Sequence, residues 1–253
     1  MTPRTALVTG ATAGFGTAIT RRLIADGHRV IGAGRRPERL DALAGELGEA
    51  FLPWPLDVTD AHALAALPDA LPAAWRTIDI LVNNAGLALG VAPAHEASLA
   101  DWERMVATNV LGLMRLTHAI LPGMVARGRG DVVNLGSVAA NYPYPGGNVY
   151  GATKAFVQQF TLGLKADLVG TGVRVSDIQP GLVGGTEFST VRFKGDDAKA
   201  TAMYANTVAM GPDDIAETVA WIVGLPAHLN VNRIELMPTV QGPGPFVVKR
   251  KEI

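Results

Sequence analysis

The chain has 253 residues, no cysteine and a formal net charge of −1 at pH 7, and 48% of its residues are hydrophobic. The absence of cysteine excludes disulfides, thiolate catalysis and cysteine-ligated metals, and the near-neutral charge argues against nucleic-acid binding. No apolar run is long enough to span a bilayer, and no signal peptide precedes the first strand. We therefore expect a cytoplasmic protein with a large core.

Short apolar segments alternate with segments of helical periodicity along the chain. The first expected strand covers residues 6–9, and a glycine turn and a helix around residues 19–25 follow it. Further strands are expected over residues 29–33, 54–57, 78–82, 131–135, 173–178 and 233–236. Further helices are expected over residues 37–47, 99–125, 149–168 and 213–223.

This alternation predicts an α/β protein with a single-domain Rossmann fold, in which helices cover both faces of a doubly wound, seven-stranded parallel sheet. The length would also fit two small domains. No linker divides the chain, however, so residues 1–253 are expected to form one dinucleotide-binding and catalytic domain. Residues of about 181–210 break the alternation and are expected to form a substrate loop. A Pro/Gly-rich tail covers about 238–253.

Gly10, Gly14 and Gly16 lie between the first expected strand and its helix. Glycine is required where a side chain would block a pyrophosphate or strain a tight turn. The amino terminus of the following helix supplies amide donors for phosphate. Because strand and helix flank the glycines in the required order, this turn predicts a dinucleotide site.

Tyr150 and Lys154 are four residues apart on an expected helix, and Ser137 precedes them by about one loop. Residues four apart share one helix face. A nearby ammonium favours the phenolate and would lower the pKa of the tyrosine from its usual value near ~10. The pair could also be a surface pair without a catalytic role, but the glycine turn and Ser137 favour catalysis.

The glycine spacing, the segment 83–86 (Asn-Asn-Ala-Gly), Ser137, Tyr150 and Lys154 occur in the order of the short-chain dehydrogenase/reductase family, which the chain resembles over almost its whole length. The resemblance implies that Tyr150 is the general acid in carbonyl reduction and the general base in alcohol oxidation. Ser137 would hold the carbonyl oxygen, and Lys154 the nicotinamide ribose. Asn109 matches a position that holds a relay water, although it could equally be a helix-bending residue packed on a neighbouring strand.

The end of the second strand carries Gly34, Arg35 and Arg36, where an NAD enzyme would have an acidic residue. A guanidinium binds a 2′-phosphate through charge-assisted hydrogen bonds, so we expect NADP(H) as the cofactor; otherwise these arginines only solvate a loop. The resemblance extends the expected cofactor site to the following set: Gly10, Thr12, Gly14, Phe15, Gly16, Arg35, Arg36, Asp57, Val58, Asn83, Ala85, Gly86, Tyr150, Lys154, Pro180, Gly181, Val183 and Thr186.

Residues 150–157, 180–189 and 191–196 resemble one subgroup, the bacterial NADP-dependent 3-hydroxy acid dehydrogenases. This implies interconversion of a small 3-hydroxy acid of the serine, allo-threonine or 3-hydroxypropionate type with its 3-oxo or semialdehyde form. Such a substrate is an anion and needs a cation near the nicotinamide. Arg192 is the expected cation and Lys194 the second choice, unless Arg192 is paired with Glu187, Asp196 or Asp197.

The expected substrate residues are Ser137, Asn141, Gly147, Tyr150 and Arg192, with Tyr142 and Asn148 from the same variable stretch. The five histidines are scattered, and no metal site is expected. Two alternatives stay open: a broad NADPH carbonyl reductase that accepts ketones, aldehydes or sulfoacetaldehyde, and an NADP-binding regulator without chemistry. By resemblance we expect a homotetramer, with the apolar tail segment 246–249 docked on another subunit.

Overall fold

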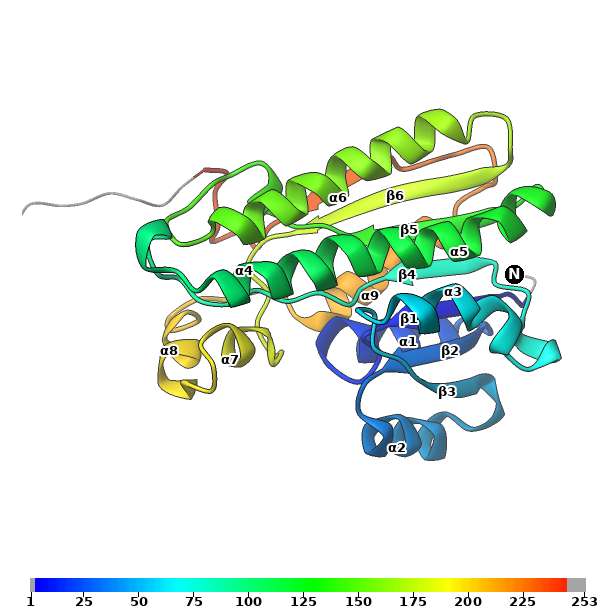
Figure 1. Cartoon of the computed structure of the whole chain (residues 1–253), viewed down its shortest axis with the longest axis horizontal. Coiled ribbons are helices and arrows are strands. Elements are labelled where there is room, and N and C mark those ends of the chain that lie inside the picture. Colours follow the sequence, from blue (N-terminus) through cyan, green and yellow to red (C-terminus); the bar gives the residue numbers. More distant parts are fainter. Residues whose placement is uncertain (1–2, 245–253) are drawn as a thin grey trace, which may run out of the picture.

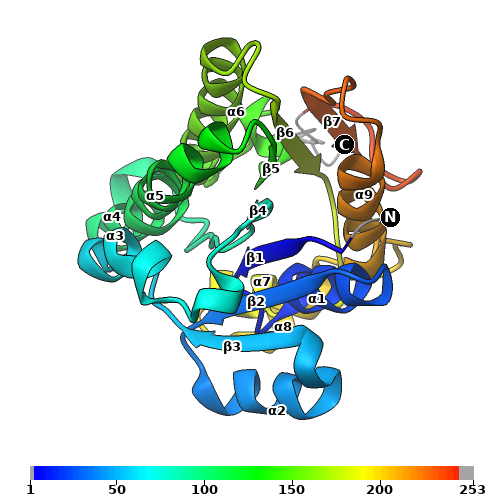
Figure 2. The same cartoon turned by 90° about the vertical axis from the view of Figure 1, so that its right-hand side faces the viewer.

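Seven parallel strands form one twisted sheet in this computed structural model, which describes residues 3–244. Their order across the sheet is β3-β2-β1-β4-β5-β6-β7, as Figure 2 shows. The strands are β1 (Thr5–Thr9), β2 (Arg29–Gly34), β3 (Phe51–Pro55), β4 (Ile80–Asn83), β5 (Gly130–Leu135), β6 (Val173–Pro180) and β7 (Arg233–Leu236). The order reverses between β1 and β4, which is where doubly wound sheets bind dinucleotides.

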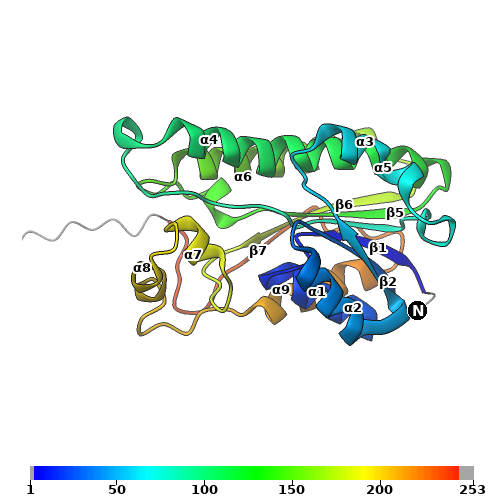
Figure 3. The ribbon, with the colours of Figure 1, turned by 60° about the horizontal axis from the view of Figure 1, so that its bottom comes forward.

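Helices cover both faces of the sheet (Figure 3). The helices α1 (Gly14–Ala25), α2 (Pro37–Leu47) and α9 (Pro212–Gly224) lie on one side. The other side carries α3 (Ala61–Ala70), α4 (Leu99–Val106), α5 (Leu113–Ala126) and α6 (Asn148–Asp167). Two short helices, α7 (Phe188–Arg192) and α8 (Asp197–Ala202), lie beyond one end of the sheet, close to where β6 ends (Figure 1).

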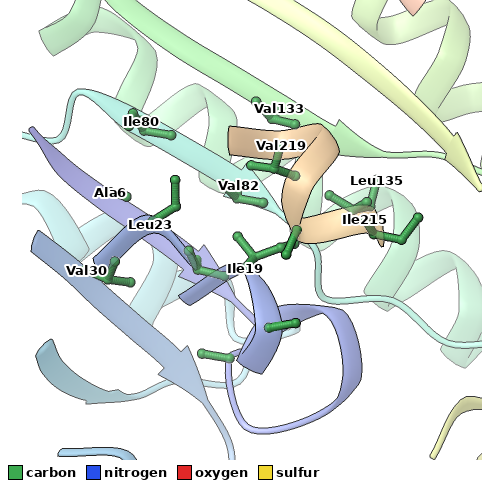
Figure 4. Close-up of a cluster of buried hydrophobic side chains, with 14 of the residues drawn as sticks. Ala6, Ile19, Leu23, Val30, Ile80, Val82, Val133, Leu135, Ile215 and Val219 are labelled. Carbon is green, nitrogen blue, oxygen red and sulfur yellow. The ribbon is translucent and has the colours of Figure 1, made fainter. Parts of the chain in front are cut away.

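Two apolar layers hold the helices on the sheet. Alternate strand residues face opposite sides, so Ala6 and Val8 belong to one layer and Leu7 to the other. In the first layer Ile19 of α1 and Val219 of α9 pack on the central strands (Figure 4). The near-continuous apolar runs of the strands therefore follow from burial on both faces.

The predicted sheet and most predicted helices are confirmed, with three differences. Helix α3 was not predicted; it contains Pro68, and its start is fixed by the Asp60 carboxylate, which accepts from two backbone N–H groups. The expected helix over 99–125 is interrupted by a π-helical turn, Ala107–Gly112. The segment expected to form a substrate loop, residues 181–210, contains α7 and α8, which the sequence pattern did not predict.

The expected docking of residues 246–249 lies outside the described residues. Between residues 3 and 244, no helix combines the length and the apolar character that crossing a membrane requires.

Candidate active site

A cavity of about 310 Å³ opens at the carboxyl ends of the central strands, between the glycine turn, α6 and the loop that follows β6. Most of the expected cofactor residues line it. These are Gly10, Thr12, Gly14, Phe15, Arg35, Arg36, Asp57, Val58, Ala85, Gly86, Tyr150, Lys154 and Thr186. The fold thus brings together side chains from six separate segments at the sheet edge where a dinucleotide is expected.

The glycine turn has a backbone that only glycine accommodates. Gly10 and Gly14 have φ angles of 67° and 48°, in the left-handed region. A Cβ on Gly16 would overlap the carbonyl oxygen of Gly10, so Gly16 lets α1 approach β1 closely. Helix α1 begins without a side-chain cap, which leaves its first amide groups available to a phosphate. This turn fits a pyrophosphate.

The arginines after β2 are in different environments. Arg35 is exposed beside the cavity and makes no hydrogen bond or ion pair within residues 3–244. Arg36 donates to the Thr12 side chain at 3.2 Å and to Glu187 at 2.9 Å. The sequence reasoning missed Arg39, whose guanidinium also pairs with Glu187, at 2.8 Å.

Tyr150 and Lys154 lie on the first turns of α6 and face the cavity, with Ser137 at the end of β5. Burial raises the pKa of Tyr150 to about 12, although the neighbouring Ser137 hydroxyl lowers it. The expectation that Lys154 lowers this pKa is wrong here. The Lys154 Nζ donates to the Leu135 carbonyl at 2.6 Å and lies 5.8 Å from the centre of the Tyr150 ring.

A buried carboxylate lies behind this centre. Asp177 on β6 is 1% exposed, and one of its oxygens, Oδ1, has no hydrogen-bond partner within the described chain. A side chain at Gly136 would overlap that carboxylate, so glycine is needed beside Ser137. Burial lowers the pKa of Lys154 to about 8, and the charge of Asp177 opposes this effect. Asp177 is therefore the counter-charge of Lys154.

Asn109 lies in the π-helical turn between α4 and α5 and is buried. Its amide donates to the Leu87 carbonyl at 2.8 Å and to the Thr153 hydroxyl at 3.1 Å, and its oxygen accepts from the Leu87 N–H. These bonds fasten the loop after β4 to α6. The side chain thus joins a loop and a helix and does not pack on a neighbouring strand as the alternative expected, and a water-holding role stays a prediction.

Arg192 is buried, with 6% of its surface exposed, at the end of α7. Its Nη2 donates to the Tyr144 hydroxyl at 2.7 Å, and its Nε has no partner within the described residues. The alternative that it pairs with an acid of its own loop is wrong. Glu187 pairs with Arg36 and Arg39 instead, and Asp196 with Lys199.

The loop between β5 and α6 holds Tyr144 in place. A Cβ on Gly147 would overlap the Tyr144 ring, so the ring lies directly on the glycine backbone. Gly146, with a φ of 75°, packs equally closely on the Val91 backbone. Gly147 therefore positions Tyr144, a residue that the sequence reasoning did not single out, and its part in a substrate site stays a prediction.

Several expected site residues point elsewhere. The Asn83 amide is buried against Asn134 and Thr117, because strand alternation turns it into the sheet. Asn141 donates to Gln179 and Glu235, and Lys194 pairs with Asp101.

Other predicted residues also lie outside the cavity, and several residues that line it were not predicted. The Tyr142 hydroxyl bonds to Glu235, and Asn148 is exposed at the start of α6. Pro180 ends β6, and Gly181 and Val183 follow it. The predicted site residues that are not among those lining the cavity also include Gly16, Ser137, Gly147 and Arg192. The lining residues that sequence reasoning missed are Ala13, Gly34, Leu56, Asn84, Leu87, Thr108, Leu135, Gly136, Glu187, Phe188 and Val191. Only Asn84 carried a signal, its place beside the expected Asn83.

The described residues contain no group of three or more histidine, aspartate or glutamate side chains placed to hold a metal ion.

Comparison with known proteins agrees with this geometry. The family model described as short chain dehydrogenase matches residues 4–197. An NADP-dependent 3-hydroxy acid dehydrogenase of Salmonella typhimurium is 61% identical over 235 residues, which are 93% of this chain and 95% of the relative. The serine 3-dehydrogenase of Agrobacterium fabrum is 52% identical over 247 residues, 98% of each chain.

Among solved structures, the closed form of serine dehydrogenase complexed with NADP+ superposes with a TM-score of 0.95 at 58% identity. The match covers 98% of this chain and 100% of that chain. The family match spans every residue that lines the cavity. The chain therefore belongs to the short chain dehydrogenase family.

Proposed function

We propose that this protein is an NADP(H)-dependent oxidoreductase that interconverts a small 3-hydroxy acid and its 3-oxo or semialdehyde form. Similar chains bear the names of 3-hydroxy acid and serine dehydrogenases, and the names of two of them include NADP. The observation that carries the proposal for this chain is the buried guanidinium of Arg192, which has no anionic partner within residues 3–244.

The cavity has the donors that such a cofactor needs. The turn around Gly10 and Gly14 would receive the pyrophosphate, and Arg35 the 2′-phosphate. Lys154 and Thr186 line the opposite end, where the nicotinamide ribose and the ring would lie. When bound, the cofactor supplies or accepts the hydride; the protein's part is to orient the reactants and to move a proton.

Tyr150 would move that proton. Because its pKa is raised to about 12, the phenol is protonated at neutral pH and can donate its proton to a carbonyl oxygen. The Ser137 hydroxyl beside it would donate a second hydrogen bond to the same oxygen and fix the carbonyl carbon. In the oxidative direction the phenolate is needed, so the positive groups around the bound reactants must lower this pKa.

Arg192 would select the substrate. Burying an ion costs several kcal/mol unless an opposite charge compensates it. Arg192 is close enough for its charge to lower the pKa of Tyr150. In a 3-hydroxy acid, one carbon separates the carboxylate from the reacting carbon. This carboxylate would supply the missing negative charge and accept a hydrogen bond from the unpartnered Nε.

Tyr144 would complete this subsite. Its hydroxyl accepts a hydrogen bond from Arg192, which leaves its own proton free for a carboxylate oxygen. Its ring stands 5.1 Å from the guanidinium carbon, and Gly147 fixes the ring from the other side. Arg192 and Tyr144 therefore offer donors to both oxygens of a small acid.

A second candidate is a broad carbonyl reductase. Leu87, Phe188 and Val191 line the cavity, and the Phe188 ring lies edge-on to Tyr150 with 5.8 Å between ring centres. These apolar surfaces would also accept a neutral ketone. The choice between the candidates thus depends on whether the anion or the apolar wall dominates selection.

The test follows the formation of NADPH by its absorbance at 340 nm. The substrates compared are 3-hydroxypropionate, serine, allo-threonine and neutral secondary alcohols. We expect the acids to be preferred, and Tyr150→Phe to lose turnover by about 10²–10⁴-fold while still binding NADPH. Equal turnover of neutral alcohols would favour the carbonyl reductase. NADPH binding without any turnover would favour the regulator, and near-normal activity of Tyr150→Phe would refute the mechanism.

We also propose assembly into a homotetramer. Phe156 and Phe160 are stacked on α6 with 5.5 Å between ring centres and remain half-exposed, and Leu162 is 36% exposed on the same helix. A second copy of the chain would cover them. A monomeric mass in solution would contradict this. A cytoplasmic location belongs to the same proposal and is tested by cell fractionation.

A further inference from the structure

Glu187 connects two segments that lie on opposite sides of the cofactor cavity. It stands at the start of α7, in the loop after β6, whereas its partners Arg36 and Arg39 belong to the connection from β2 into α2. Its Oε2 is 2.9 Å from Arg36 Nη1, and its Oε1 is 2.8 Å from Arg39 Nη2. One carboxylate thus holds two guanidinium groups across the mouth of the cavity.

The same arginines are fastened to the glycine turn. Arg36 donates from Nε and Nη2 to Thr12, and Arg39 donates from Nη1 to the Thr12 carbonyl. Thr186, next to Glu187, lies against Gly14, where an added Cβ would come within 3.1 Å of its side chain. The loop, the arginines and the phosphate-binding turn therefore form one closed ring of contacts.

This ring closes over the place where a dinucleotide would lie. Arg36, Thr186 and Glu187 all line the cofactor cavity. Arg39 and Glu187 also line a second cavity of about 410 Å³ on the far side, so the ion pairs stand in the wall between the two. Figure 3 shows α7 beyond the end of the sheet, on the same side as α1 and α2.

The two neighbouring arginines after β2 then have different tasks. The Nε and Nη2 groups of Arg36 are bonded to Thr12 and one hydrogen of its Nη1 to Glu187, so Arg36 has a single N–H left for a 2′-phosphate. Arg35 has no hydrogen bond or ion pair within the described chain and lines the same cavity. Discrimination between NADP and NAD should therefore rest on Arg35.

We propose that Glu187, through Arg36 and Arg39, is a clasp that retains the bound dinucleotide and sets the rate at which it leaves, irrespective of its 2′-phosphate. The inference rests on the proposed use of a nicotinamide cofactor, and it concerns release of the cofactor, not the chemical step. Opening the clasp exposes the cavity mouth, and closing it restores both ion pairs.

The glutamate should be ionised over the whole working range. Hydrogen bonds from Arg39 and from Arg36 lower the pKa of its carboxyl. The three side chains are between 36% and 45% exposed, so the pairs are screened by salt and can open without a large cost. These are the properties that a reversible closure needs.

The experiment measures NADPH and NADH release from the full-length protein by stopped-flow fluorescence, with an excess of unlabelled competitor. We expect Glu187→Gln to speed the release of both cofactors by about three- to tenfold. Arg36 stays bonded to Thr12, so the ratio of the two affinities should change by less than this factor. Arg35→Ala should instead change selectivity: the affinity for NADPH should fall about tenfold, and the affinity for NADH should change little. High salt should bring the wild-type rate toward that of the variant.

Glu46→Gln is the matched control. Glu46 forms a pair of 2.7 Å bonds with Arg21 and is as exposed as Glu187, but the pair joins α1 and α2 away from the cavity. Glu46→Gln should leave the release rates of both cofactors unchanged. The clasp is overturned if Glu187→Gln releases both cofactors at the wild-type rate. It is also overturned if only NADPH binding changes, because the carboxylate would then act on the 2′-phosphate. Failure to bind either cofactor in the wild type would instead refute the proposed function.

Discussion

Two buried arginines, Arg174 at the start of β6 and Arg192 at the end of α7, have different surroundings. Arg174 donates to Asp131 at 2.6 Å and to the backbone carbonyls of Val223, Leu225 and Leu229. Arg192 makes one side-chain hydrogen bond, to Tyr144, and its Nε is left unpartnered among residues 3–244. A satisfied buried charge completes a fold, whereas an unsatisfied one at the ligand-binding edge is kept for a ligand.

The largest expected effect separates the two arginines by stability. Arg174→Met leaves Asp131 with Arg4 as its remaining partner, so the free energy of unfolding should fall by about 3 kcal/mol. Arg192→Met removes a charge without a partner and should change stability by less than about 1 kcal/mol, or increase it. Urea unfolding monitored by circular dichroism measures the free energy of unfolding of both variants. Equal losses of stability would contradict the distinction between the two arginines.

Asp177 extends the comparison to a carboxylate. Burial raises its pKa from 3.8 to about 6, so the folded protein binds this proton more tightly than the unfolded chain. Its contribution to stability is therefore present below pH 4 and is lost as the pH rises to about 6.

Asparagine cannot ionise, so Asp177→Asn should lack this loss. The stability of the variant relative to wild type should rise by about 1–3 kcal/mol between pH 4 and pH 6. Thermal unfolding across this range tests it. A constant difference would mean that Asp177 does not titrate there.

Tyr144→Phe should have the smallest effect and should act only on anionic substrates. Loss of the hydroxyl removes one bond to Arg192 and one free donor, so KM for a 3-hydroxy acid should rise about five- to tenfold. Its KM for a neutral alcohol should stay the same. Gly147→Ala, whose Cβ would displace the ring, should act in the same direction. A fall in kcat with both substrates would argue for a structural role.

The sequence predicted those parts of the molecule that depend on local backbone geometry. Gly10 and Gly14 follow from turn geometry, and Tyr150 and Lys154 from helix spacing. Side-chain directions depend on tertiary packing, so the inward turn of Asn83 and the outward bonds of Asn141 could not be read from their motifs. Arg39 and Tyr144 were missed because their partners, Glu187 and Arg192, are distant in sequence.

The pKa of Tyr150 was misjudged for the same reason. Spacing gave its proximity to Lys154, but burial, which dominates, appears only once the loop after β6 covers α6. The π-helical turn at Asn109 likewise depends on tertiary contacts, since its side chain bonds to Leu87 and to Thr153 of α6.

The most direct test of the account is the specificity of Arg192→Met. The ratio of kcat/KM for 3-hydroxypropionate to that for its neutral amide, 3-hydroxypropanamide, is measured with NADP+ in wild type and variant. Because a charge-assisted pair contributes about 1.5–3 kcal/mol, we predict that the ratio falls about 10- to 100-fold, with the amide itself hardly affected. An unchanged ratio would contradict the central claim that this site is built for an acid.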